Sequence, residues 1–255
     1  MTKSASNNQV KEWRKLLMGK YRKKNGLFPA EGLRCVEQIL KNSALSITEI
    51  LTDGDFSLTG LSIPGSIPIF QLSSEDFSSI SDTETSQGVI AVCKIPAESS
   101  IEKITKTEGL IIALDAIQDP GNLGTIIRTA AWFGVKGIIF GTGCVDPFHP
   151  KVVRSTAGAT GAIPYLKGDL KNILNHLERE TREIFLLDGS ARSESLGAVS
   201  TSKNAVIVVG NEGSGIDSEL IKPSRKLIRI DGHSDVVESL NAAIAMSIAL
   251  NTFSR

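Results

Sequence analysis

Three short polar segments carry the residues best suited to chemistry. Residues 119–124 read Asp-Pro-Gly-Asn-Leu-Gly and are soon followed by Arg128. Residues 210–215 read Gly-Asn-Glu-Gly-Ser-Gly, and residues 239–241 read Ser-Leu-Asn. Glycines let a ligand approach the backbone without a Cβ in the way, and the polar side chains supply hydrogen bonds and charge. The segments therefore predict a site assembled from three separate parts of the chain.

Apolar runs are placed to position these segments. Residues 110–115 and 205–209 have the composition of buried strands, and each is followed directly by one of the first two segments. Loops at the carboxyl ends of such strands are where open α/β sheets bind ligands. The third segment opens residues 239–252, which are apolar nearly all round and predict a buried helix.

The rest of the second half alternates between strand and helix patterns. Strands are predicted at 137–140, 184–187 and 227–230, and helices at 125–134, 151–158 and 169–180. This alternation favours the α/β class with a mostly parallel, doubly wound sheet.

The first half predicts a smaller α/β layer. Helices are expected over 7–24 and 31–40, with a helical turn that starts at Ser73 or Ser74; short strands are expected at 47–51, 67–71 and 89–94. A polar, proline-led break at 96–100 separates the halves. We therefore expect an N-terminal domain over residues 1–98 and a C-terminal domain over residues 99–255.

Charge is balanced over the whole chain but uneven along it. The 255 residues include 28 Lys or Arg and 28 Asp or Glu. Residues 1–26 hold eight basic residues against one acid, whereas residues 42–93 hold seven acids and no Lys or Arg. The N-terminal segment is either a basic arm that binds phosphates or a solvated helix face.

Several classes of protein are not indicated. No apolar run approaches the ~18 residues of a membrane-spanning helix, and the N-terminus lacks the apolar core of a secretory signal. Cys35, Cys93 and Cys144 show neither metal-ligand spacing nor a disulfide framework, which fits the reducing cytoplasm.

Cofactor motifs of other enzyme classes are absent as well. The sequence has no Gly-x-Gly-x-x-Gly fingerprint and no Walker loop with its lysine. His149, His176 and His233 are isolated from one another and from the cysteines. Neither a nicotinamide enzyme nor a metal enzyme is predicted.

The second half resembles the SpoU-type members of the SPOUT superfamily, the RNA ribose 2′-O-methyltransferases. The likeness rests on residues 114–130, 207–215 and 228–243, with support from 151–159. The N-terminal domain is similar to that family's substrate-binding module at residues 26–34 and 87–91, and this module resembles an L30e/L7Ae-like ribosomal-protein fold that binds RNA.

One stretch departs from the family pattern. The family often reads Ile-Pro-Met-x-Gly shortly before Ser-Leu-Asn, but this chain has Ile230-Asp231-Gly232 and a longer loop over residues 231–238. The departure affects the rim of the implied cofactor pocket rather than the implied reaction.

The resemblance implies methyl transfer from S-adenosylmethionine to a ribose 2′-hydroxyl of structured RNA, with ribosomal RNA favoured over transfer RNA. It also implies a deep trefoil knot in the C-terminal domain and a homodimer whose site lies near the interface. No metal is required, because the sulfonium is already an activated methyl donor.

The same resemblance assigns residues to three groups. The implied catalytic residues are Arg128, Asn122, Glu212, Ser239 and Asn241. Those implied to contact the cofactor are Gly210, Asn211, Gly215, Ile230 and Leu240. Those implied to contact RNA phosphates are Lys23, Lys24, Arg34, Lys151 and Arg154.

Individual roles within the catalytic group remain open. Arg128 acts on the 2′-hydroxyl as a base, or by hydrogen bonding and holding a phosphate, since arginine is normally protonated. Glu212 orients Arg128 or Asn241, or is a solvated loop acid. Asn122 and Ser239 each have an alternative role as a helix cap.

Two competing functions are considered. The first is a catalytically inactive RNA-binding protein of the same fold, which predicts loss of Arg128, Glu212 or Asn241, and all three are present. The second is an unrelated α/β enzyme acting on a small molecule, which the basic N-terminal segment and the RNA-module likeness disfavour.

Overall fold

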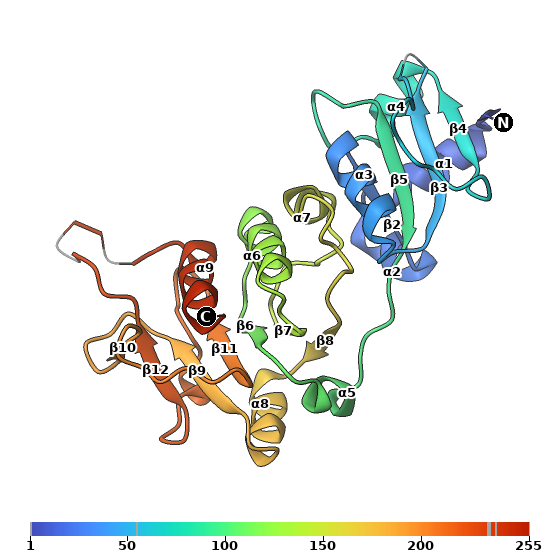
Figure 1. Ribbon diagram of the computed structural model, residues 1–255. Helices are drawn as coiled ribbons and strands as arrows, with labels where there is room; N and C mark the ends of the chain where they lie inside the picture. The colour runs from blue at the N-terminus through green and yellow to red at the C-terminus, as the bar shows by residue number, and fades with distance from the viewer. Residues whose placement is uncertain (1, 55, 234–235, 238, 255) are drawn as a thin grey trace. The chain divides into compact units, whose positions relative to one another are not determined.

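The computed structural model describes residues 2–54, 56–233, 236–237 and 239–254 (Figure 1). The chain divides into an N-terminal unit, Met1–Ala97 with Asp146–Ala162, and a C-terminal unit, Glu98–Val145 with Ile163–Arg255. The predicted boundary at 98/99 lies one residue from this division. Domains 1–98 and 99–255 stay a prediction, because residues 146–162 pack with the N-terminal unit.

The N-terminal unit is built on a mixed five-stranded sheet. In spatial order its strands are β1 (Thr2–Ser4), β4 (Ile69–Leu72), β3 (Ile47–Asp53), β5 (Val89–Lys94) and β2 (Leu27–Glu31). The first three are parallel, and β5 is antiparallel to both of its neighbours. The three predicted strands are confirmed, whereas β1 and β2 were not predicted. Pro29 is tolerated in β2 because that strand lies at the edge of the sheet.

Helices cover this sheet. They are α1 (Asn7–Lys15), α2 (Gly19–Asn25), α3 (Leu33–Asn42), α4 (Ser74–Ile80) and α7 (Pro150–Ser155). Apolar side chains of α1 and α4, with Trp13 and Phe77 among them, share a buried cluster with β3, β4 and β5. The helix α3 packs on β5 and β2, and α7 packs on β2.

The prediction of one continuous helix over 7–24 is wrong. Met18 is extended, with φ −97° and ψ 128°, and separates α1 from α2. The buried Arg22 guanidinium donates from Nη1 to the carbonyl oxygens of Leu16 and Leu17, at 3.0 and 2.9 Å. Arg22 also donates to Asp146 Oδ2 from Nη2 at 2.6 Å, so the break depends on a residue far along the chain.

The C-terminal unit confirms the α/β prediction. Its seven strands lie in the order β10 (Glu194–Ser195), β12 (Lys226–Arg229), β9 (Glu183–Leu187), β11 (Ala205–Val209), β6 (Ile111–Leu114), β7 (Gly137–Gly141) and β8 (Tyr165–Gly168). Every neighbouring pair is parallel. All the strand carboxyl ends therefore lie at one edge, which we call the carboxyl edge.

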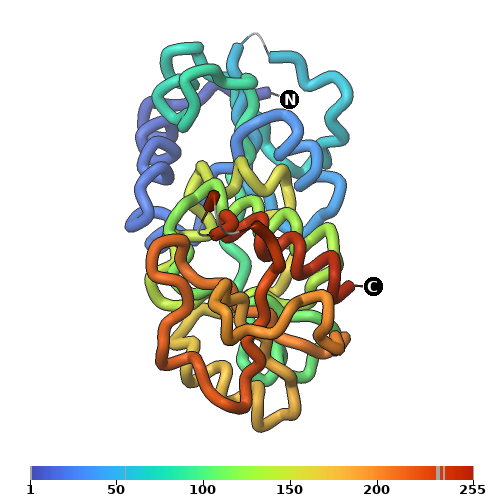
Figure 2. The backbone as a smooth tube through the Cα atoms, turned by 90° about the vertical axis from the view of Figure 1, so that its left-hand side faces the viewer, coloured from blue at the N-terminus to red at the C-terminus, as the bar shows by residue number. Residues whose placement is uncertain are grey.

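Helices lie on both faces of the parallel sheet, as Figure 1 shows. A buried cluster on one face joins α5 (Ile101–Lys106), α8 (Leu170–Arg179) and the 3₁₀ turn η1 (Ser218–Leu220) to alternate strand residues. On the other face α6 (Pro120–Trp132) packs against α9 (Ala242–Phe253), and α9 packs on β11. The red α9 again lies beside the green α6 in the turned view of Figure 2. Two helix layers thus enclose the strands.

The predicted limits of two helices are corrected. The helix α6 begins at Pro120, five residues before the predicted start, because Asp119 caps it by accepting from Asn122 N at 2.8 Å. The helix α9 begins at Ala242, and its cap is Asn241 rather than Ser239.

The prediction that the last helix is buried is confirmed for one face only. Ile244 and Ile248, on one face of α9, are 49% and 37% exposed. None of the described helices combines the length and apolar character that spanning a membrane requires.

Candidate functional site

The first two polar segments start side by side at the carboxyl edge. Leu114 at the end of β6 pairs with Val209 at the end of β11. Beyond that pair, Asp115 N donates to Val209 O at 2.9 Å, and Asn211 Nδ2 donates to Ala116 O at 2.9 Å. The strand register therefore brings together two segments that are about ninety residues apart in the sequence, as predicted.

Asn211 organises the 210–215 loop. Its backbone exchanges hydrogen bonds with Gly215 at 3.0 and 2.9 Å, and its Oδ1 accepts from Gly213 N and Ser214 N at 2.9 and 3.2 Å. A Cβ on Gly210 would lie 2.3 Å from the Gly215 carbonyl, so only glycine fits there. The closed loop presents the exposed side chain of Glu212.

The helices α6 and α9 run in the same direction, with their N-termini together. Near their starts, Asn241 Nδ2 donates to Asn122 Oδ1 at 2.9 Å. About two turns later, Ser247 Oγ donates to Thr129 Oγ1 at 3.4 Å. Both helix N-termini, with their partial positive charge, therefore lie beside the 210–215 loop.

Three predicted catalytic residues form one hydrogen-bonded group, which we call the Asn–Glu–Asn cluster: Asn122, Glu212 and Asn241. Asn122 Nδ2 donates to Glu212 Oε1, and Asn241 Nδ2 lies 3.5 Å from the same oxygen. The Oδ1 atom of Asn241 is occupied as the cap of α9, accepting from Ala243 N at 2.9 Å and Ile244 N at 3.3 Å. Each of the three polar segments contributes one member, and the mutual bonds fix both amide orientations.

Arg128 lies apart from this cluster on the surface of α6. It is six residues after Asn122, a separation of about 120° around the helix axis. Its side chain is exposed and makes no hydrogen bond or ion pair within the described part of the chain. Glu212 therefore contacts Asn241 and not Arg128. Ser239 is exposed and likewise has no hydrogen-bond partner among the described residues.

Ile230 and Leu240 lie at the two ends of the segment between β12 and α9. Neither residue has a hydrogen-bond partner among the residues that the structure describes. Backbone N–H and C=O groups of this kind can pair with the edge of a nucleoside, so they are compatible with S-adenosylmethionine. Within the divergent 231–238 loop, Ser234, Asp235 and Glu238 lie outside the described residues.

Two acidic residues that the sequence reasoning missed support the first segment. Asp119 is the cap of α6, and an Asp-Pro pair ahead of an apolar run was the signal for it. Asp115 accepts from Asp217 N at 2.7 Å and ties β6 to the chain after the 210–215 loop. Desolvation of this half-buried carboxylate raises the pKa of Asp115 above its ordinary value.

All five residues implied to contact RNA belong to the N-terminal unit. Lys23 and Lys24 lie on α2, Arg34 on α3, and Lys151 and Arg154 on α7. Arg154 pairs with Asp82 at 3.1 Å. The other four are exposed, and their side chains make no ion pair within the described residues.

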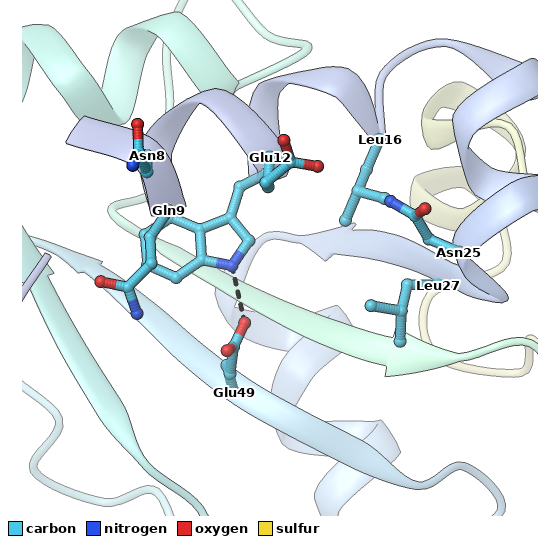
Figure 3. A pocket seen from close by; sticks show the side chains of 8 residues that line it. Asn8, Gln9, Glu12, Leu16, Asn25, Leu27 and Glu49 are labelled. Carbon is cyan, nitrogen blue, oxygen red and sulfur yellow. Dashed lines mark hydrogen bonds between the residues drawn. The ribbon is translucent and has the colours of Figure 1, made fainter. Parts of the chain in front are cut away.

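A pocket of about 290 Å³ lies elsewhere in the N-terminal unit, beside α1 (Figure 3). Trp13 forms its wall and donates from Nε1 to Glu49 Oε2 at 2.6 Å. Its lining residues are Asn8, Gln9, Glu12, Trp13, Leu16, Asn25, Leu27 and Glu49. The lining has two carboxylates and no Lys or Arg, so the pocket does not suit a phosphate.

Neither a metal centre nor a reactive thiol is seen. Among the described residues, no three His, Cys, Asp or Glu side chains gather in a way that could hold a metal ion. The cysteines are free, and burial raises the pKa of Cys35 to about 12.

Comparison with known proteins gives two matching family models. The model described as the SpoU rRNA Methylase family matches residues 109–251, and the model described as the MRM3-like substrate binding domain matches residues 7–91. The first contains all three polar segments.

Individual relatives match over nearly their whole length. The 23S rRNA (guanosine(2553)-2′-O)-methyltransferase RlmP of Bacillus subtilis is 34% identical over 96% of this chain and 95% of its own. A solved TrmH-family structure from Porphyromonas gingivalis has a TM-score of 0.85 and 32% identity, covering 98% of both chains. The S-adenosylmethionine-bound rRNA methyltransferase of Sinorhizobium meliloti has a TM-score of 0.84 and 29% identity, covering 99% of this chain and 97% of that one.

Proposed function

The chain belongs to the SpoU rRNA methylase family, and we propose that it methylates a ribose 2′-hydroxyl of large-subunit ribosomal RNA with S-adenosylmethionine. The observation that carries this proposal is the Asn–Glu–Asn cluster, in which the three motifs of the family meet through hydrogen bonds. The full-length relative in Bacillus subtilis, whose name specifies 23S rRNA, supports the choice of RNA.

The chemistry places two demands on the protein. S-adenosylmethionine carries its methyl group on a positively charged sulfur. When the methyl group is transferred, the rest of the cofactor leaves as a neutral thioether. The ribose hydroxyl is a weak nucleophile until its proton is removed or polarised, so protein groups must orient it, and the proton itself passes to an RNA phosphate oxygen or to water.

We assign the second demand to Arg128. Its guanidinium is exposed and makes no ion pair within the described residues, so it is available to RNA. A protonated arginine donates hydrogen bonds, and it suits a phosphate or the hydroxyl oxygen better than it suits proton abstraction. Arg128 therefore holds the ribose and its phosphate in place during methyl transfer.

The Asn–Glu–Asn cluster is the fixed part of the site. Because Glu212 holds both amides, it keeps the 119–124 segment, the 210–215 loop and the start of α9 in one arrangement. Ser239, one residue from the cofactor-contacting Leu240, completes the proposed catalytic set. Gly210, Asn211 and Gly215 shape the loop whose backbone contacts the cofactor.

The N-terminal unit is the proposed RNA-binding part. Lys23, Lys24, Arg34 and Lys151 are exposed without ion-pair partners in the described structure, and residues 7–91 match a substrate-binding model. Such charges neutralise phosphates and add affinity without reading sequence. Arg154, paired with Asp82, joins this set by exchanging its partner for a phosphate.

We further propose that the protein is a homodimer through α6 and α9. Trp132 is 84% exposed, and it lies one turn after Arg128 on α6. Ile244 and Ile248 are exposed on the adjoining α9. A large apolar side chain on each of two packed helices supports a contact between copies. Sedimentation at micromolar concentration should give twice the mass of one chain.

The trefoil knot and the cellular location are proposed on separate grounds. The knot is supported by the path of the chain after β12. That strand lies beyond β9 in the sheet, and the chain then returns so that α9 packs on β11 and α6.

A cytoplasmic location is supported by three free cysteines, as expected in a reducing compartment.

The function is tested with purified protein, radiolabelled S-adenosylmethionine and large-subunit rRNA from cells that lack this protein. We expect label in one ribose-methylated nucleotide of that RNA and none in rRNA from unaltered cells, which is already methylated. Label in tRNA instead would refute the proposed substrate. RNA binding without cofactor binding would favour the inactive alternative.

A further inference from the structure

Asp231 stands where the family pattern often has proline, and its carboxylate is held on two sides. Ser195 Oγ donates to Asp231 Oδ2, and Arg229 Nε donates to Oδ1 at 3.0 Å. Arg229 in turn donates from Nη1 to Ser193 O. The start of the divergent loop is therefore tied to β10, the edge strand of the parallel sheet.

This link is isolated along the chain. From Ile230 to Leu240, Asp231 alone among the described residues makes hydrogen bonds. Among the described residues that follow, the next one with a hydrogen bond is Asn241, the cap of α9. Asp231 and Asn241 therefore hold the two ends of the segment that carries Ile230 and Leu240.

The local sequence explains why an anchor is needed at this point. A proline would fix φ after Ile230 and reduce the freedom of the unbound chain. Here the residue after Asp231 is Gly232, which adds freedom that must be lost when the segment is ordered. The hydrogen bonds of the charged Asp231 side chain to Ser195 and Arg229 restrict the chain here, where the backbone itself does not.

We propose that Asp231 is a positioning residue for the cofactor rim: by bonding to Ser195 and Arg229 it holds the Ile230 backbone in the arrangement that binds S-adenosylmethionine. This inference rests on the proposed function. Asp231 acts through Ile230 and does not itself take part in the transfer. The Ser195 hydroxyl, followed by the Arg229 charge, lowers the pKa of Asp231, which agrees with a carboxylate that stays ionised.

The test compares Asp231→Ala, Asp231→Asn and Ser195→Ala in the full chain, with Glu219→Gln as the control. Glu219, within η1, is also an exposed carboxylate paired to a basic side chain, Lys171 at 2.9 Å. Equilibrium binding of S-adenosylmethionine is measured by calorimetry. Hydrogen exchange at residues 229–232 is measured without cofactor.

Asp231→Ala should weaken cofactor binding about tenfold, because it removes both hydrogen bonds of this exposed carboxylate. Asp231→Asn and Ser195→Ala should each lose less, because each keeps one of the two bonds. Exchange at 229–232 should be faster in Asp231→Ala, while kcat at saturating cofactor and the thermal midpoint stay near those of the wild type.

Two outcomes would overturn the inference, and they are distinguishable. Equal cofactor affinity in Asp231→Ala and the wild type would remove the positioning role and leave the proposed function intact. A wild-type protein that does not bind S-adenosylmethionine would overturn both.

Discussion

The proposed catalytic residues of the C-terminal unit and the proposed RNA contacts of the N-terminal unit differ in how their side chains are held. In the C-terminal unit, Asn122, Glu212 and Asn241 hold one another, and each is fixed by a helix start or a tight loop. In the N-terminal unit, four of the five proposed RNA contacts stand alone within the described structure. A methyl transfer requires groups held in one geometry, whereas a phosphate backbone can be bound by charges that act independently.

This difference has a measurable consequence. Substitutions within the hydrogen-bonded cluster should be non-additive, because the first change already releases the remaining partners. The effects of substitutions among the isolated lysines should be additive, and these effects should depend on the salt concentration. Arg128 is in the proposed catalytic set because of the motif in which it stands. Like the lysines, however, it makes no hydrogen bond or ion pair among the described residues. It therefore tests most directly whether the two groups of residues differ.

The largest effect is expected for Arg128→Ala. If Arg128 orients the ribose, kcat should fall by about 100-fold or more, which is the scale expected when a reacting group loses its correct position. Cofactor affinity should stay within a few-fold, because Arg128 makes no hydrogen bond to the residues proposed to bind the cofactor in the part of the chain that the structure describes. Steady-state kinetics and calorimetry on the same preparation measure both quantities.

Arg179→Ala is the matched control, since Arg179 is an exposed arginine on α8. If Arg128→Ala raises only the KM for RNA and leaves kcat unchanged, Arg128 is one more phosphate contact and belongs with the lysines.

The second largest effect concerns coupling inside the cluster. Asn122→Ala and Asn241→Ser should each lower kcat about tenfold, and the double variant should lose far less than the ~100-fold product. Serine at 241 keeps the helix cap but is too short to reach Glu212. Kinetics of the four proteins in this cycle give the interaction directly. Additive losses would show that the bonds seen between these side chains do not organise the site.

A smaller effect is expected for Lys23→Gln and Lys24→Gln. Each should raise the KM for RNA a few-fold at constant kcat, and the double variant should equal the product of the two. Each lost phosphate contact should reduce the slope of log affinity against log salt by about 0.7–0.9. RNA binding across a salt series measures this, with the exposed Lys203→Gln of the C-terminal unit as the control. A change in kcat would place these lysines in the chemistry.

The same contrast explains how far the sequence could be read. The strands 110–115 and 205–209 and the three motifs predicted the cluster, because local composition and spacing determine where each strand ends. The break at Met18 could not be predicted, since it depends on Arg22 reaching Asp146. The packing of residues 146–162 with the N-terminal unit is also a long-range contact, which no local pattern encodes. Whether Glu212 contacts Arg128 or Asn241 required the fold.

The smallest effect is expected beneath the cluster, at Asp115. Its pKa is raised by desolvation, so the folded state binds a proton more tightly than the unfolded state does. The carboxylate therefore favours folding at low pH and loses that contribution as pH rises through its folded-state pKa. Asparagine can still accept from Asp217 N without carrying a charge. Asp115→Asn should raise the thermal midpoint by about 1–2 °C at pH 7.

The pH dependence of the difference in thermal midpoint between Asp115→Asn and the wild type separates the effect of the charge from that of the hydrogen bond. Scanning calorimetry should show the difference in midpoint shrinking as the pH falls through the raised folded-state pKa of Asp115, and vanishing below about 3.9, where the residue is protonated in both states. Glu98→Gln, which changes an exposed acid near the unit boundary, is the control substitution. A lower midpoint for Asp115→Asn at pH 7 would mean that the hydrogen bond to Asp217 outweighs desolvation. Asp115 would then resemble the residues of the Asn–Glu–Asn cluster, in which each polar group is stabilised by its hydrogen-bond partner.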